Sequence, residues 1–84
     1  MVIKMSNGQY VTNRVKELIA EKARRTGEKI TYRTIAAETG MSKNTVGKWA
    51  RNEVIDYNRD IIATFCDFFE CAVSELIVYE KPKS

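Results

Sequence analysis

The stretch Tyr32–Arg51, YRTIAAETGMSKNTVGKWAR, constrains the fold more than any other part of this sequence. Two helices that cross at about 90–120° through a short turn need a small residue where the second helix passes over the first. Ala36 suits that position, and Gly40 tolerates the positive φ angle that such a turn requires. After the turn, Val46 and Trp49 recur three residues apart on one inward face. The pattern therefore predicts a helix-turn-helix unit.

The outer face of the second of these helices is polar and cationic. The side chains that remain outward or at its N-terminal end are those of Ser42, Lys43, Asn44, Thr45 and Lys48. Asn can form two hydrogen bonds with adenine, and Lys can reach the acceptors of guanine. Hydroxyl groups and the amides of a helix N-terminus suit phosphate oxygens. Because no Asp or Glu occurs from position 41 to position 52, this face indicates contact with the major groove of double-stranded DNA.

Gly47 falls on the same predicted outer face. Glycine within a helix costs about 1 kcal/mol relative to alanine, and the sequence offers no packing reason for that cost. We therefore expect Gly47 to let the helix approach DNA closely, while Trp49 belongs to the core.

The charges of the chain are distributed unevenly. The net charge is +3, but residues 1–51 hold eleven Lys and Arg against four Asp and Glu, whereas residues 52–84 hold three against seven. A chain polarised in this way indicates that its first half meets an anion. Lys29, before the second helix, is compatible with either phosphate contact or solvent exposure.

Helical spacing of apolar residues predicts further helices on both sides of this unit. The buried face of a first helix is expected to consist of Val15, Leu18, Ile19 and Ala23. Thr12 or Asn13 is expected to cap its start, and Gly27 lies just past its end. In the helix-turn-helix unit, caps are expected at Thr31 and Ser42, and the buried positions at Ile35, Ala36, Val46, Trp49 and Ala50.

A polar loop over residues 53–58 is expected to lead into a fourth helix. Its core side chains would be Ile61, Ile62, Phe65, Phe68 and Phe69. Ser74–Ile77 suits one further turn, and the β-prone pair Val78-Tyr79 can join Val2-Ile3 or Tyr10-Val11. The sequence therefore predicts an all-α domain of four to five helices with a short terminal β pairing. Residues 1–84 would form a single domain with its core over about 11–79 and a flexible tail over 80–84.

The two cysteines and the absence of histidine restrict the chemistry. Cys66 and Cys71 are five residues apart, which on a continuous helix turns their side chains about 140° away from each other. We therefore expect two buried thiols without a disulfide, and no zinc site, because two thiolates alone cannot complete four ligands. The sequence holds no histidine, no Gly-rich phosphate loop and no paired carboxylates beside a nucleophile. These features predict neither an enzyme nor a cofactor.

The hydropathy pattern bears on location. No stretch reaches the roughly 18 apolar residues that span a bilayer, and the N-terminus lacks the apolar run of a signal peptide. We expect a cytoplasmic protein without membrane contact.

The sequence resembles the Cro and lambda-repressor type of helix-turn-helix protein, which implies a bacterial or phage-encoded protein. The likeness runs from Val11 to about Tyr79, and its final part is Phe65-Cys66 to Ser74-Glu75-Leu76-Ile77. It implies a five-helix domain whose third helix enters the major groove. By this resemblance Lys43, Asn44 and Lys48 match base-facing positions, and the positions that touch backbone or flanking bases are those of Ser42, Thr45 and Tyr32 or Arg33.

This sequence departs from the usual pattern of that family at two places. Tyr32 stands where many members have Gln, and Ala50-Arg51 stands where Glu and Asn are common, so that Arg51 adds positive charge. Asn52 ends the third helix, as Gly or Asn often does in the family. The full set of expected DNA-binding residues is Tyr32, Arg33, Ser42, Lys43, Asn44, Thr45, Lys48, Arg51 and Asn52.

Together these features predict sequence-specific binding of double-stranded DNA. A chain of 84 residues leaves little room for an effector domain, so we expect a transcriptional repressor that acts by occupying its operator. One recognition helix reads only a half-site, which predicts a homodimer; no small-molecule ligand is evident. The alternative is a protein-interaction module built on the same fold, such as an antitoxin or adaptor component.

Overall fold

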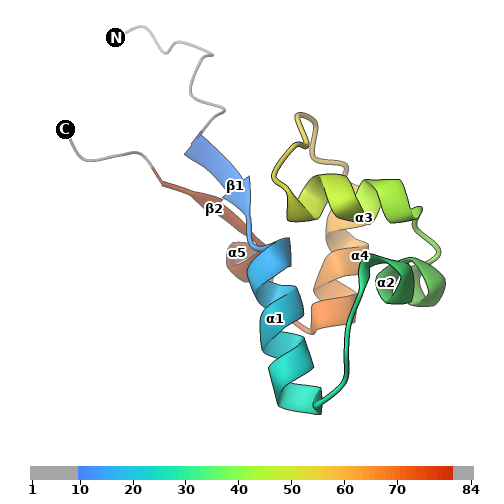
Figure 1. Cartoon of the computed structure of the whole chain (residues 1–84). Helices are drawn as coiled ribbons and strands as arrows, with labels where there is room; N and C mark the ends of the chain where they lie inside the picture. Colours follow the sequence, from blue (N-terminus) through green and yellow to red (C-terminus); the bar gives the residue numbers. More distant parts are fainter. Residues whose placement is uncertain (1–9, 81–84) are drawn as a thin grey trace, which may run out of the picture.

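The computed structural model describes residues 10–80, which form five helices and two short strands (Figure 1). In chain order these are β1 (Val11–Asn13), α1 (Val15–Thr26), α2 (Tyr32–Thr39), α3 (Lys43–Ala50), α4 (Arg59–Phe69), α5 (Val73–Leu76) and β2 (Ile77–Tyr79). The all-α class with five helices and a terminal β pairing is confirmed. No helix within the described residues is long and apolar enough to cross a membrane.

The two strands join the ends of the described chain. β1 and β2 pair antiparallel, with Val11 opposite Tyr79 and Asn13 opposite Ile77. The Glu80 amide donates to the Tyr10 carbonyl at 3.0 Å, so Glu80 extends the pairing and does not begin a free tail. Of the two expected partners of the C-terminal strand, the segment at Tyr10-Val11 is confirmed. Val2-Ile3 and the expected flexible residues 81–84 lie outside the described residues.

The core forms where α1, α3 and α4 meet. Its buried apolar side chains are Val15, Leu18, Ile35, Val46, Trp49, Ala50, Phe65, Phe69 and Leu76. Trp49 is at its centre, with its ring centroid 4.9 Å from that of Tyr57 and 5.1 Å from that of Phe65. Ala36 is only half-buried, contrary to expectation. It follows the fully buried Ile35 and is therefore turned about 100° around α2 from the buried side of the helix.

The helix ends follow the local signals in most cases. Thr31 and Ser42 cap α2 and α3 as expected, and Gly27 and Gly40 end α1 and α2 with φ angles of 73° and 82°. The start of α1 differs from expectation, because its N-cap is Arg14 and no side chain caps it in the usual way. The Asn13 side chain nevertheless accepts a hydrogen bond from the Val15 amide at 3.0 Å.

The end of α4 corrects the expectation for the cysteines. Helix α4 stops at Phe69, and Glu70 adopts a left-handed backbone with φ 54°. The Cys71 amide then donates to the Cys66 carbonyl at 3.0 Å, a helix-ending turn in which the side chains of these two positions meet. The thiols therefore lie side by side rather than pointing apart, although both remain free and only half-buried. Burial and the neighbouring Cys66 raise the pKa of the Cys71 thiol from 9.0 to about 11.

Candidate DNA-binding surface

The turn between α2 and α3 sets the angle at which the two helices cross. The left-handed backbone of Gly40 ends α2, and the Gly40 amide donates to the Ala36 carbonyl at 2.9 Å. The Thr39 hydroxyl donates to the Ile35 carbonyl at 2.6 Å and accepts from the Met41 amide at 3.2 Å. These bonds fix the turn from both sides, and the helix-turn-helix unit expected from the sequence is confirmed.

Helix α3 has one buried and one exposed face. Val46, Trp49 and Ala50 are at most 5% exposed, whereas Lys43, Asn44 and Lys48 are exposed. Because the buried residues fix how α3 can rotate, the exposed ones must face outward. The composition expected for the outer face of α3 is therefore found on the surface.

Two hydroxyl groups occupy the N-terminal end of α3. The Ser42 Oγ accepts from the Thr45 amide at 3.1 Å and donates to the Thr45 Oγ1 at 2.8 Å. Of the first-turn amides, which have no partner within the helix, that of Thr45 is capped by Ser42, and those of Lys43 and Asn44 lie next to it. This end of α3 offers several hydrogen-bond donors and no carboxylate.

The lysines of α3 do not all point in one direction. At about 100° per residue, Asn44, Lys48 and Arg51 share one stripe of the helix, and Lys43 is turned about 100° from Asn44. Lys43 lines a hollow together with Thr31, Tyr32 and Arg33 of the α2 start. Lys48 and Thr45 line a different hollow, next to the loop of residues 53–56. The exposed cations thus form two neighbouring groups, one at each side of α3.

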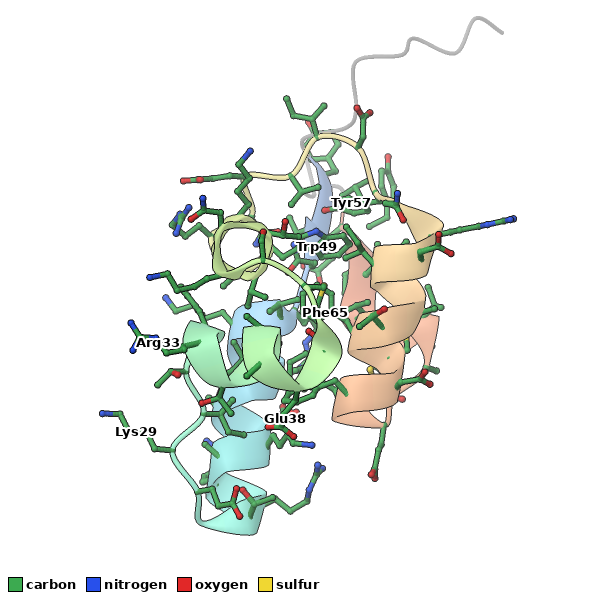
Figure 2. All side chains as sticks on the ribbon, turned by 90° about the vertical axis from the view of Figure 1, so that its right-hand side faces the viewer. Lys29, Arg33, Glu38, Trp49, Tyr57 and Phe65 are labelled. Carbon is green, nitrogen blue, oxygen red and sulfur yellow. The ribbon has the colours of Figure 1, made fainter. Side chains whose placement is uncertain are left out.

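Figure 2 shows where the cations near α2 point. The side chains of Lys29 and Arg33 project to the same side of the molecule, away from the aromatic rings of Trp49 and Phe65. Both residues are exposed. The cationic surface therefore extends from α3 across the start of α2.

Gly47 is covered by side chains, which corrects the expectation for this residue. It is buried, and a Cβ atom placed on it would lie 2.9 Å from Nη1 of Arg51 and 3.6 Å from Cδ2 of Tyr32. The glycine thus has a packing reason, because the Arg51 guanidinium lies over it beside the Tyr32 ring. The expectation that Gly47 presents open backbone was wrong, since Arg51 folds back along the helix.

Glu53 lies beside Arg51, a contact that the sequence did not predict. Its Oε1 atom lies 3.2 Å from Nε of Arg51, and its amide donates to the Lys48 carbonyl at 2.9 Å. The signal available in the sequence was its position as the first carboxylate after α3, two residues beyond Arg51.

Asn52 joins the end of α3 to β1. Its Oδ1 accepts from the Asn13 amide at 2.8 Å, and its Nδ2 donates to the Asn13 carbonyl at 3.4 Å. Asn52 adopts φ 57°, a left-handed conformation that Asn tolerates better than most residues. Its side chain is thus already engaged within the protein.

Metal binding finds no support in this part of the chain. Within residues 10–80, no three side chains of His, Cys, Asp or Glu come close enough to hold a metal ion. The arrangement can offer hydrogen-bond donors, hydroxyl groups and positive charge to an anionic polymer.

Comparison with known proteins agrees with this geometry. The sequence model of the Cro/C1-type HTH DNA-binding domain matches residues 14–82. A crystal structure of a candidate DNA-binding protein from Bacteroides fragilis is similar, with 26% sequence identity and a TM-score of 0.65, over 81% of this chain and 98% of that one. No functionally curated protein matches the sequence. The family match covers most of the chain, including all of α1–α5, and the chain therefore belongs to the Cro/C1-type helix-turn-helix DNA-binding domains.

Proposed function

We propose that this protein binds a specific sequence of double-stranded DNA, with α3 in the major groove, and represses transcription by occupying its operator. The observation that carries the proposal is the outer face of α3, where Asn44 and Lys48 are exposed above the buried Val46 and Trp49. No carboxylate occurs from position 41 to position 52, so nothing within α3 repels the phosphates beside the groove.

The exposed residues divide into base-reading and phosphate-binding roles. Asn44 and Lys48 lie on the central stripe of α3 and suit adenine and guanine edges, respectively. The phosphate contacts are assigned to polar and cationic side chains at the start of α3 and the start of α2. They are those of Ser42, Lys43 and Thr45 on the α3 side and those of Tyr32 and Arg33 on the α2 side. Asn52 acts by holding the end of α3 against β1.

A homodimer in the cytoplasm is part of this proposal. One α3 reads a half-site of only a few base pairs, so a second copy is needed for a longer, near-palindromic operator. Val73 and Tyr79 are 54% and 56% exposed, and these large apolar side chains at the C-terminal end of the fold are the surface we assign to the contact. Sedimentation that showed only monomers, both free and on a symmetric site, would contradict this part.

The test of the proposal combines selection from random DNA with salt titration. Oligonucleotides selected by the protein should share a near-palindromic sequence. On random DNA, contact with about six phosphates gives a slope near −5 for log K against log salt concentration. No binding at about 50 mM salt would instead support the protein-interaction module.

Substitution of the α3 residues separates their roles. Asn44→Ala should weaken the best site by about 1–3 kcal/mol and relax the preference at one base position. Lys43→Ala should weaken every site to a similar extent, because a phosphate contact carries no sequence information. If neither change altered binding, α3 would not be the recognition helix.

A further inference from the structure

We propose that Arg51 determines specificity on this surface by recognising guanine, and that Gly47 and Glu53 position its guanidinium for that contact. This inference rests on the function proposed above. It adds a third base contact, made by Arg51 at the end of α3, to the stripe that Arg51 shares with Asn44 and Lys48.

The absence of a side chain at Gly47 leaves the space that the Arg51 guanidinium occupies. A Cβ at this position would lie 2.9 Å from Nη1 of Arg51, closer than Cβ atoms approach, and 3.6 Å from Cζ, an ordinary contact, so the guanidinium would have to shift. Arg51 therefore folds back by one helical turn and lies over the middle of α3. Because Arg51 is seven residues after Asn44, both leave the helix from nearly the same side.

Glu53 lies beside the guanidinium and biases its orientation. Its carboxylate binds Nε of Arg51 at 3.2 Å, and the two side chains are 52% and 55% exposed. An exposed ion pair of this kind contributes little to stability, so the part we assign to Glu53 is a bias in the orientation of the guanidinium and not added stability. With the carboxylate on the Nε side of the guanidinium, the donors of Nη1 and Nη2 stay available and form a planar fork.

The neighbouring carboxylate decides which DNA group Arg51 contacts. A phosphate oxygen brought to this guanidinium would approach the Glu53 carboxylate, and the two negative charges repel each other. The guanine edge is uncharged and presents two acceptors, O6 and N7, that match the arginine fork. A guanine in the major groove therefore fits this pair of side chains better than a phosphate does.

The experiment compares four forms of the protein on two DNAs. Wild type, Arg51→Lys, Glu53→Gln and the control Asp56→Asn are titrated with the best selected site and with random DNA, and each variant repeats the selection. Asp56 lies in the same loop as Glu53, and none of the ion pairs seen within residues 10–80 includes it. Both acid-to-amide changes remove one negative charge and should strengthen binding to random DNA alike.

The expected difference lies in discrimination. Replacing one guanine of the site should weaken wild type and Asp56→Asn by about tenfold or more. Arg51→Lys and Glu53→Gln should lose most of that discrimination. If Glu53→Gln kept the discrimination of wild type, or if Arg51→Lys selected the same guanine equally well, the inference would be overturned while the proposed function stood. A wild type without sequence preference would overturn both.

A double-mutant cycle tests the part assigned to Gly47. Gly47→Ala should reduce discrimination to the level of Arg51→Lys, because the new Cβ displaces the guanidinium. In an Arg51→Ala background the same change meets only Tyr32 at 3.6 Å, an ordinary contact, and should have no further effect on binding. Equal losses in both backgrounds would show that Gly47 acts independently of Arg51.

Discussion

Trp49 is the residue that fixes how α3 faces outward. Its side chain is 1% exposed and lies between the rings of Tyr57 and Phe65, with centroid distances of 4.9 and 5.1 Å. Trp49→Ala removes these contacts and leaves a cavity, so we expect a loss of about 3–5 kcal/mol in the free energy of unfolding. Chemical denaturation measures it. Lys48→Ala, one residue earlier and exposed, is the control and should stay within about 0.5 kcal/mol of wild type.

Cys71 makes the stability of the fold depend on alkaline pH. The folded thiol has a pKa of about 11 against an ordinary value of 9.0. Between these pH values the Cys71 thiol loses its proton more readily in the unfolded chain than in the folded one. The stability that the protonated thiol contributes to the fold is therefore complete below pH 9.0 and is lost as the pH rises through 11. In urea denaturation under reducing conditions, the free energy of unfolding of wild type should fall more steeply over this interval than that of Cys71→Ala. Parallel curves would contradict the prediction.

At the scale of the elements, the hydrogen bonds and the backbone conformation of Asn52 stabilise the end of α3. Asn52→Gly keeps the left-handed backbone but removes both hydrogen bonds to Asn13, and should cost about 1 kcal/mol. Asn52→Ala adds the strain of a left-handed backbone, roughly a further 1–2 kcal/mol. Thermal or chemical denaturation of the two variants separates these contributions. Equal stability of the two variants would show that the backbone conformation at this position is not strained.

The elements also show which features a sequence can predict. The caps at Thr31 and Ser42 and the turn at Gly40 were predictable because their hydrogen bonds reach no further than four residues along the chain. The Asn52–Asn13 bonds link residues that are 39 positions apart, and no local pattern indicates them. The cysteines were misplaced for a related reason, since only the left-handed Glu70 turns Cys71 back toward Cys66.

Across the whole molecule, the strands connect the ends of the described chain to the region of α3. The Arg14 amide, directly after β1, donates to the Leu76 carbonyl at 2.8 Å, and Asn13 of β1 bonds Asn52, two residues after α3. The start of the described chain is therefore joined to the C-terminal elements, with β1 beside β2 in Figure 1, and to the residues that follow α3. The absence of Asp and Glu from position 41 to position 52 was sufficient to locate the candidate surface from the sequence. It was insufficient for the hollow that Lys43 shares with the start of α2, which depends on how α2 packs against α3. It was also insufficient for the cover over Gly47, which depends on the direction taken by the Arg51 side chain.

The proposed dimer leads to a prediction about operator geometry. Two copies related by a twofold axis place their α3 helices on one face of the duplex only if the half-sites are about one helical turn apart. Inserting about five base pairs between the half-sites rotates them to opposite faces, so only one copy at a time can bind. The second copy of the dimer then cannot bind the second half-site of the same DNA. The affinity should therefore fall by about a hundredfold, to that of an isolated half-site. Electrophoretic mobility measurements on the two DNAs test this expectation, and unchanged affinity on the spaced site would show that the copies bind independently.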